Sequence, residues 1–258
     1  MGPLGDEMEF GTPHRHFART DSTNTRAREL AAAGAPHGTV VTADEQTAGR
    51  GRQGRTWTAP CRGSLLYSAI LRPLGERPLL PLAAALAVCE AAEGLAPGLS
   101  CGVKWPNDVQ LDGRKLAGIL IEARVQEGWA VIGVGLNLSI EPHEFSPELR
   151  QTAVSLFTSH SPRRGRSDLS RSKGQIDPSA GARAAGGLSE RLAHWVDADA
   201  AAILSAWRER DALHGREVAW GGGSGVAEGV DDLGRLVVAA AGGRRLALVA
   251  GEVHLLAT

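Results

Sequence analysis

The chain has 258 residues and a formal net charge of −1, with 43% hydrophobic and 22% charged residues. This composition is that of a soluble globular protein with one medium domain and room for a smaller one, and the near-neutral charge argues against a protein that coats nucleic acid. Three cysteines lack metal-ligand spacing, and neither a signal peptide nor a bilayer-length apolar run is visible, which together indicate a cytoplasmic protein with reduced thiols and no membrane partner.

The first third of the chain predicts short strands and helices joined by turns. A strand, a polar turn and a helix are expected within residues 16–34, where the side-chain oxygens of residues 21–23 can cap the helix. Residues 38–46 and 64–73 predict buried strands, the second stopped by a proline. The alanine-rich stretch 78–95 predicts an apolar helix that packs on the sheet.

The stretch from Cys101 to Ile140 is the densest strand region. Asp112-Gly113 is a hairpin signal, and a second turn is expected at residues 126–128. Strands joined by such short turns indicate a mainly antiparallel sheet, unlike the parallel sheet of a nucleotide-binding βαβ fold.

The second half begins with a break in this pattern. Residues 159–187 are polar and basic, which favours a disordered insertion, with a basic docking patch as the alternative. Residues 188–213 predict helix, as one element or as two divided near Asp197. The remaining residues, 214–258, alternate short strands with Gly-rich turns and predict a small β-barrel.

Several common catalytic motifs are absent from the sequence. It contains no GxxxxGK[ST] phosphate loop, no GxSxG elbow, no CxxC pair and no HExxH helix. Metal-hydrolase and serine-hydrolase functions are therefore disfavoured.

Five unusual segments remain, each on an expected loop or at a strand end. They are DSTN (21–24), EQTAGRGRQGRTW (45–57), KWPND (104–108), RKLAGILIE (114–122) and GVGLN (133–137).

Each segment also has an ordinary structural interpretation. The first could simply cap a helix, Lys104 could extend its ammonium group to water, and the glycines of the last could mark a bulge. The glycine-arginine segment alone fits an RGG-like contact with nucleic acid, a phosphate-binding loop or a solvated connector.

Taken together, in this order and spacing, the segments resemble the catalytic domain of biotin–protein ligases. The resemblance runs from Phe17 to Asn137 and continues more loosely to the C-terminus. It implies an α/β (α+β) fold, with a central mixed β-sheet flanked by helices as in class II synthetases, and a small C-terminal SH3-like β-barrel. The domains expected are a flexible N-terminus (1–15), a catalytic domain (16–213) with the insertion at 159–187, and the barrel (214–258).

The family joins biotin to ATP, forming biotinyl-5′-AMP and pyrophosphate, and then transfers biotin to one lysine of a carboxylase's biotin carboxyl carrier domain. The first step brings a carboxylate against a triphosphate, and at about 4 Å with an effective dielectric constant near 20 that repulsion is roughly 4 kcal/mol. Fixed positive charge is therefore required. The resemblance assigns catalysis to Arg52 and Lys104.

The resemblance also implies which residues bind each substrate. The expected biotin contacts are Ser22, Thr23, Asn24, Gln46, Arg50, Gly51, Arg52, Lys104 and Gly118. The expected contacts of ATP and the adenylate are Arg50, Arg52, Arg55, Trp57, Asn107, Lys115 and Asn137. Asp108 is the expected Mg²⁺ ligand, helped by Asn107 and Asn137, and it is also the candidate group for deprotonating the acceptor lysine.

Three alternatives stay open. A lipoate–protein ligase shares this fold and the adenylation chemistry, although the glycine-arginine and KWPND segments have the forms typical of the biotin branch. A non-catalytic biotin-binding protein and a nucleic-acid-binding protein that uses the glycine-arginine loop are the others. Only about 16 residues precede the catalytic segment, so the DNA-binding domain of some family members is not expected, and the protein is expected to be a monomer or a homodimer.

Overall fold

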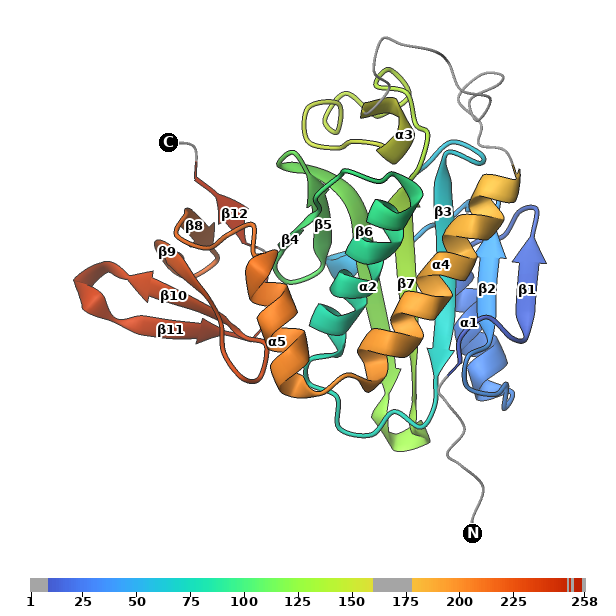
Figure 1. Cartoon of the computed structure of the whole chain (residues 1–258), viewed down its shortest axis with the longest axis horizontal. Coiled ribbons are helices and arrows are strands. Elements are labelled where there is room, and N and C mark those ends of the chain that lie inside the picture. The colour runs from blue at the N-terminus through green and yellow to red at the C-terminus, as the bar shows by residue number, and fades with distance from the viewer. Residues whose placement is uncertain (1–8, 160–177, 250, 252, 257–258) are drawn as a thin grey trace.

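The computed structural model describes residues 9–159, 178–249, 251 and 253–256. Two β-sheets and five α-helices organise this part of the chain, as Figure 1 shows. The strands of the first sheet are β1 (His14–Phe17), β2 (Val40–Ala43), β3 (Ser64–Leu71), β4 (Gly102–Lys104), β5 (Asp108–Leu111), β6 (Arg114–Arg124) and β7 (Trp129–Asn137). The helices are α1 (Thr23–Ala32), α2 (Leu80–Leu95), α3 (Leu156–Ser159), α4 (Pro178–Asp197) and α5 (Ala200–Glu209).

The seven-stranded sheet is mixed, with the order β1-β2-β3-β7-β6-β5-β4. Strands β1 and β2 pair in parallel, and the other neighbouring strands of this sheet pair antiparallel. This confirms the prediction of a central mixed sheet that is mainly antiparallel.

Helices cover both faces of this sheet (Figure 1). Helices α2 and α4 pack on one face, where Tyr67 is fully buried and its hydroxyl lies 2.9 Å from the Ser189 hydroxyl of α4. Helix α1 packs on the other face through Ala27 and Ala31, which contact Val41 of β2. Alternate residues of β3 and β7 therefore point to two different helical layers.

Helix α4 corrects one expectation about the insertion. Residues 160–177 lie outside the described residues, but residues 178–187 form the first half of α4 rather than a disordered stretch. Small side chains explain this, because Ala180 and Ala184 are buried and α4 packs closely along the equally alanine-rich α2. The helical region then divides at Asp197, where α4 ends, as one of the two predicted alternatives requires.

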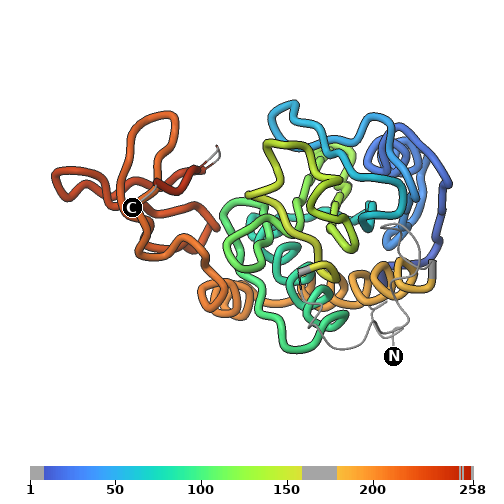
Figure 2. Tube along the Cα trace, turned by 90° about the horizontal axis from the view of Figure 1, so that it is seen from above, coloured from blue at the N-terminus to red at the C-terminus, as the bar shows by residue number. Residues whose placement is uncertain are grey.

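The C-terminal segment forms a separate antiparallel sheet. Its strands are β8 (Glu217–Trp220), β9 (Gly223–Val230), β10 (Leu236–Ala240), β11 (Arg245–Leu248) and β12 (His254–Leu255), in the order β11-β10-β9-β8-β12. The all-β character agrees with the sequence, while closure into an SH3-like barrel stays a prediction. Figure 2 shows this sheet to one side of the larger unit, next to α5.

Two sets of contacts join the end of β4 to the C-terminal part of the chain. The Trp105 indole N–H donates to the Gly234 carbonyl at 3.0 Å, between β9 and β10. On the outer edge of β4, the Val103 N–H donates to the Arg210 carbonyl at 2.7 Å, and the Ala212 N–H donates to the Val103 carbonyl at 3.0 Å. Among the described residues, no helix is long and apolar enough to cross a lipid bilayer.

Candidate functional site

A single cross-strand row brings several of the predicted residues to one face of the sheet. Lys104 lies opposite Asp108, Asp108 opposite Gly118, Gly118 opposite Gly135, and Gly135 opposite Leu66. Directly opposed residues share a face, and this is the face on which α1 packs. The KWPND, RKLAGILIE and GVGLN segments thus meet on one face of the sheet although they are separate in sequence.

A β-bulge adds Lys115 to the same face. The pairing of β5 with β6 shifts between Val109 and Gln110, so that Gln110 lies opposite Lys115. Strict alternation from Gly118 would place Lys115 on the opposite face, whereas the extra residue in β6 returns it to the face of Asp108. The Lys115 ammonium nitrogen lies 2.6 Å from Asp108 Oδ1.

The glycine-arginine segment forms a small hairpin over this face. The backbone N–H of Trp57 donates to the Gly49 carbonyl at 3.0 Å, and the backbone N–H of Gly51 donates to the Arg55 carbonyl at 2.7 Å. A tight turn at residues 52–54 reverses the chain. The predicted loop is therefore an ordered strap, here called the Gly-Arg hairpin (residues 48–57).

The indole of Trp57 lies on a floor made of two glycines. A Cβ at Gly135 would collide with this ring, and one at Gly118 would lie 3.1 Å from Trp57 Cζ3. The Lys115 ammonium group lies 5.8 Å from the centre of the same ring. Trp57 Nε1 is buried and has no hydrogen-bond partner among the described residues. The cross-strand glycine pair thus provides the flat surface on which an aromatic ring can lie.

Short polar side chains cluster beside this floor. Gln46 Oε1 accepts hydrogen bonds from the Thr23 N–H at 2.7 Å and the Thr23 hydroxyl at 3.0 Å. The Ser68 hydroxyl lies 2.6 Å from Asn24 Oδ1. A Cβ at Gly133 would collide with the Asn24 amide, so this glycine makes room for it. Thr23, Asn24 and Gln46 are thus brought together, and Ser68 is a member that the sequence did not reveal.

The beginning of α1 differs from the prediction. Ser22 occupies the N-cap position, but its side chain makes no capping hydrogen bond. The Asp21 carboxylate instead accepts from the Ser22 N–H at 2.6 Å, and the Thr23 N–H is satisfied by Gln46. The prediction that the side chains of residues 21–23 cap the helix is therefore wrong. The side chain of Gln46, which is distant in sequence, accepts from the first N–H of α1 instead.

One carboxylate absent from the sequence prediction connects the hairpin to α1. Glu122 of β6 accepts a hydrogen bond from Asn24 Nδ2 at 3.0 Å. It also forms ion pairs with Arg50 at 3.1 Å and with Arg28 at 3.3 Å. Alternation from Gly118 could have found it, since residues 118 and 122 share a face of a regular strand.

The second arginine of the hairpin binds the KWPND segment. Arg52 Nη1 donates to Asn107 Oδ1 at 3.0 Å, and Asn107 Nδ2 donates to the Ile119 carbonyl at 2.8 Å. Lys104 is half-buried, and its ammonium group makes no hydrogen bond or ion pair within the described part of the chain. The hairpin is therefore held at both sides, by Glu122 and by Asn107.

Asn137 and Arg55 lie differently from the other predicted residues. Asn137 is buried, its Nδ2 donates to the Val154 carbonyl at 3.1 Å, and its Oδ1 accepts from the Ser64 hydroxyl at 3.2 Å. Arg55 is exposed on the returning arm of the hairpin. The amide of Asn137 is thus engaged inside the protein, which favours a structural role.

Each of the predicted oxygen donors of the metal site has a protein partner, and a Mg²⁺ site at Asp108 stays a prediction. Asp108 is paired with Lys115, Asn107 Oδ1 accepts from Arg52, and Asn137 is bonded elsewhere. Within residues that the structure describes, no group of three or more His, Cys, Asp or Glu side chains could hold a metal ion.

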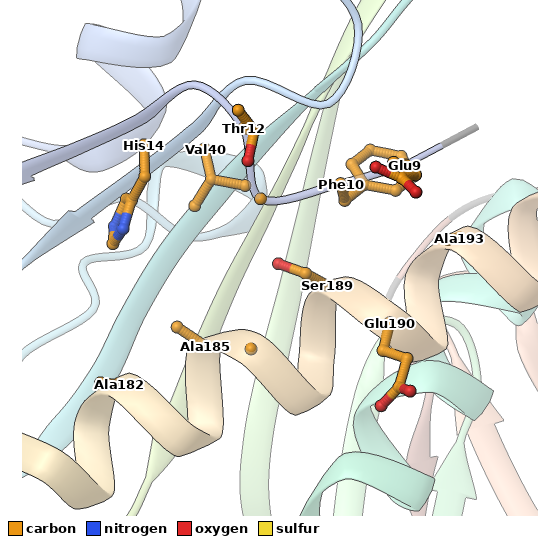
Figure 3. Close-up of a pocket in the computed structure, with 12 residues that line it drawn as sticks. Glu9, Phe10, Thr12, His14, Val40, Ala182, Ala185, Ser189, Glu190 and Ala193 are labelled. Atoms are coloured by element: carbon orange, nitrogen blue, oxygen red, sulfur yellow. The ribbon is translucent and has the colours of Figure 1, made fainter. Parts of the chain in front are cut away.

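Two cavities among the described residues lie away from this arrangement. One of about 430 Å³ lies between residues 9–14 and α4, as Figure 3 shows, and one of about 280 Å³ lies beside it along β1 and β2. Neither is lined by a predicted site residue. The Gly-Arg hairpin and Trp57 already cover the motif-bearing face.

Comparison with known proteins is consistent with the motifs and the fold. Residues 16–138 match the Biotin/lipoate A/B protein ligase family. The chain is 43% identical over 141 residues to the bifunctional ligase/repressor BirA of Bacillus subtilis, a match that spans 52% of this chain but only 43% of that relative.

Other matches cover nearly the whole chain. It is 36% identical over 251 residues to the biotin–[acetyl-CoA-carboxylase] ligase of Mycobacterium tuberculosis, covering 92% of this chain and 87% of that protein. The biotin protein ligase from Aquifex aeolicus in complex with biotin and ATP superimposes with a TM-score of 0.76 at 25% identity, covering 96% of this chain and 100% of that one. With this coverage and identity, the chain belongs to the biotin–protein ligase family.

Proposed function

We propose that this protein activates biotin with ATP to biotinyl-5′-AMP and then transfers biotin to a lysine of a biotin carboxyl carrier domain. The observation that carries the proposal is the arrangement around the glycine floor. Arg50 and Arg52 approach it from the Gly-Arg hairpin, while Lys104 and Lys115 lie on the sheet face beneath. The names of the relatives that match most of the chain support the same reaction.

The first step joins two anions. A biotin carboxylate oxygen forms a bond to the α-phosphorus of ATP, and the bond from that phosphorus to the bridging oxygen of pyrophosphate breaks. Fixed cations at the site lower the repulsion and need no reorganisation at the moment of reaction. Lys115 is well placed for this role, because it lies beside both the glycine floor and the Trp57 ring.

The polar cluster beside the floor suits the other end of biotin. The ureido ring carries one carbonyl acceptor and two N–H donors, and it is uncharged. Asn24 Oδ1 accepts from Ser68 and has a second lone pair that can accept from a ring N–H. Each hydroxyl has one proton, so Thr23 and Ser68 can donate to the ring carbonyl by turning away from Gln46 Oε1 and Asn24 Oδ1, which also leaves Gln46 Oε1 able to accept from the second ring N–H. Neutral partners of this kind bind an uncharged polar ring without leaving a charge unpaired.

The second step transfers the biotinyl group. The neutral amine of the acceptor lysine attacks the acyl carbon, the bond to the phosphate oxygen breaks, and AMP leaves. A free lysine has a pKa near 10.4, so a group must take its proton. Asp108 is the candidate, since it is the carboxylate in the row of Lys104 and Gly118.

Magnesium would enter with ATP, held mainly by phosphate oxygens and water. The protein oxygens Asp108 Oδ1, Asn107 Oδ1 and Asn137 Oδ1 near the site are already paired. The free thiols Cys61, Cys89 and Cys101 fit a cytoplasmic location, where ATP is available.

The test is exchange of labelled pyrophosphate into ATP with biotin, lipoate or octanoate as the acid. Exchange that depends on biotin supports the proposal. Exchange with lipoate or octanoate but not with biotin would identify a lipoate ligase instead. Transfer is then measured with an isolated biotin carrier domain, using a variant whose acceptor lysine is replaced by arginine as the control.

A further inference from the structure

Glu122 lies where the Gly-Arg hairpin, α1 and the sheet meet. Its side chain is 20% exposed and interacts with Arg50 of the hairpin and with both Arg28 and Asn24 of α1. A carboxylate with so little exposure to water is unfavourable unless hydrogen-bond donors or cations satisfy it. Three donors from two different elements do so, which makes this carboxylate a junction between parts of the proposed site.

The contact with Arg50 holds one arm of the hairpin. A guanidinium group has five N–H donors, and the contacts with Glu122 use Arg50 Nη1. The remaining donors can still face a phosphate, so the ion pair and a bound adenylate do not compete for the whole group. Glu122 can therefore keep the hairpin closed both before and after a ligand binds.

The contact with Asn24 fixes the direction of an amide. Asn24 Nδ2 donates to Glu122 at 3.0 Å and also lies 3.3 Å from the Leu120 carbonyl. A carboxylate accepts hydrogen bonds but cannot donate one when ionised. The NH₂ end of Asn24 is consequently held toward Glu122, and the carbonyl end is held toward Ser68 in the polar cluster.

We infer that Glu122 is a positioning residue that closes the Gly-Arg hairpin on the sheet and orients Asn24 as a hydrogen-bond acceptor for the ligand. The second part of this role rests on the proposed function, because it assigns the ligand to biotin. The first part concerns the protein without substrate and can be tested independently.

The first experiment is limited proteolysis of the full chain by trypsin, which cleaves after Arg50, Arg52 and Arg55 of the hairpin. Peptides ending within residues 50–55 are quantified by mass spectrometry over time. Glu122→Gln keeps the size and an acceptor for Asn24 but removes the charge, and the initial cleavage rate within the hairpin should rise about tenfold. Glu122→Asp keeps the charge on a shorter side chain and should give a smaller increase.

Glu90→Gln is the matched control. Glu90 is also partly buried, at 25% exposed, and pairs with Arg191 at 3.7 Å between α2 and α4. Its loss should leave hairpin cleavage unchanged. Equal cleavage rates in the wild type and Glu122→Gln would overturn the inference, as would an equal increase in Glu90→Gln. If Glu122→Gln fails to fold, the comparison of Glu122→Asp with wild type decides in the same way.

The second experiment separates orientation from general destabilisation. In the exchange assay, Glu122→Leu, which removes the acceptor for Asn24 Nδ2 that Glu122→Gln keeps, should raise the KM for biotin about tenfold and change kcat less than threefold, whereas a merely less stable protein would lose kcat in proportion to its unfolded fraction. An unchanged KM would overturn the role in orienting Asn24. Absence of biotin-dependent exchange in the wild type would refute the proposed function, while the proteolysis result would still decide whether Glu122 closes the hairpin.

Discussion

Lys115 and Asp108 form an ion pair of 2.6 Å across a β-bulge, and the bulge is what makes the contact possible. Without the extra residue in β6, the lysine would point into the apolar layer under α2. The ammonium group instead lies over the same face as the glycine floor and the Trp57 ring.

Replacing this lysine should therefore strongly reduce adenylate formation. Lys115→Met keeps the length of the side chain and removes the charge, and we expect kcat for pyrophosphate exchange to fall by about 10²–10³. Arg114→Met is the control, because Arg114 lies opposite Leu111 in the pairing of β5 with β6 and so is on the other face of the sheet from Lys115. A Lys115→Met enzyme that keeps more than about a tenth of the wild-type kcat would contradict the role of this cation.

The glycine floor should not tolerate a methyl group under Trp57. Gly135→Ala puts a Cβ into the indole ring, so the ring and the returning arm of the hairpin must move. Biotin affinity, measured by calorimetry, should fall by about tenfold or more, as expected when a close-packed contact is lost.

Gly94→Ala is the matched control for the glycine substitution. Gly94 lies in α2, and a Cβ there meets nothing within 4 Å. Alanine is the better helix former, so the free energy of unfolding should rise by roughly 0.5–1 kcal/mol without a change in biotin affinity. Unaltered affinity in both alanine variants would show that the floor is not part of the binding surface.

Asn137 should contribute to stability rather than to metal binding. Asn137→Ala leaves the Val154 carbonyl and the Ser64 hydroxyl without this partner in the interior, and the free energy of unfolding in urea should fall by about 1–3 kcal/mol. The Mg²⁺ concentration that gives half-maximal exchange should not change. A clear increase in that concentration would restore Asn137 as a metal ligand.

Asp211 gives a prediction about pH. Burial raises the pKa of this carboxyl, and its Oδ2 is buried without a hydrogen-bond partner among the described residues. An acid whose folded-state pKa is raised contributes stability that is complete below the unfolded pKa and is lost as pH rises through the folded pKa. The ionised carboxylate is therefore unfavourable at neutral pH.

Asp211→Asn should remove this dependence. As the pH falls from 7 to 4, the free energy of unfolding of the wild type should rise relative to that of the variant. The rise should be no more than about 1 kcal/mol, because the group is not fully buried. Urea unfolding at several pH values measures the difference, with the exposed Asp232→Asn as control. A difference that is constant with pH would contradict the assignment.

The sequence predicted the order of the elements and the neighbourhood of the site, because both depend on local patterns. The motif segments lie on strands and turns, which depend on residues close to one another in sequence. Their resemblance to a family implied the central mixed sheet. Arg50, Arg52, Lys115 and Asn24 were accordingly expected near one another, and the structure places them around one face.

The remaining features depend on contacts between residues distant in sequence. The bulge that turns Lys115 is a property of how β5 pairs with β6, and the cap from Gln46 requires two loops to meet. Glu122 ends the RKLAGILIE segment, and its role depends on partners in α1 and the hairpin that are distant in sequence. Helix at residues 178–187 was missed because its burial depends on α2, about 100 residues earlier.

The contacts of Val103 with residues 210–212 also determine how this protein can meet another chain. An exposed edge strand offers unpaired N–H and C=O groups to any passing strand. The strand that carries Lys104 is protected from such pairing, since the segment before the second sheet already uses the backbone groups of Val103. Strand β1 forms the other end of the sheet order. Sheet extension by a neighbouring molecule would thus be directed to β1, at the edge opposite Lys104, and would leave the reactive face uncovered.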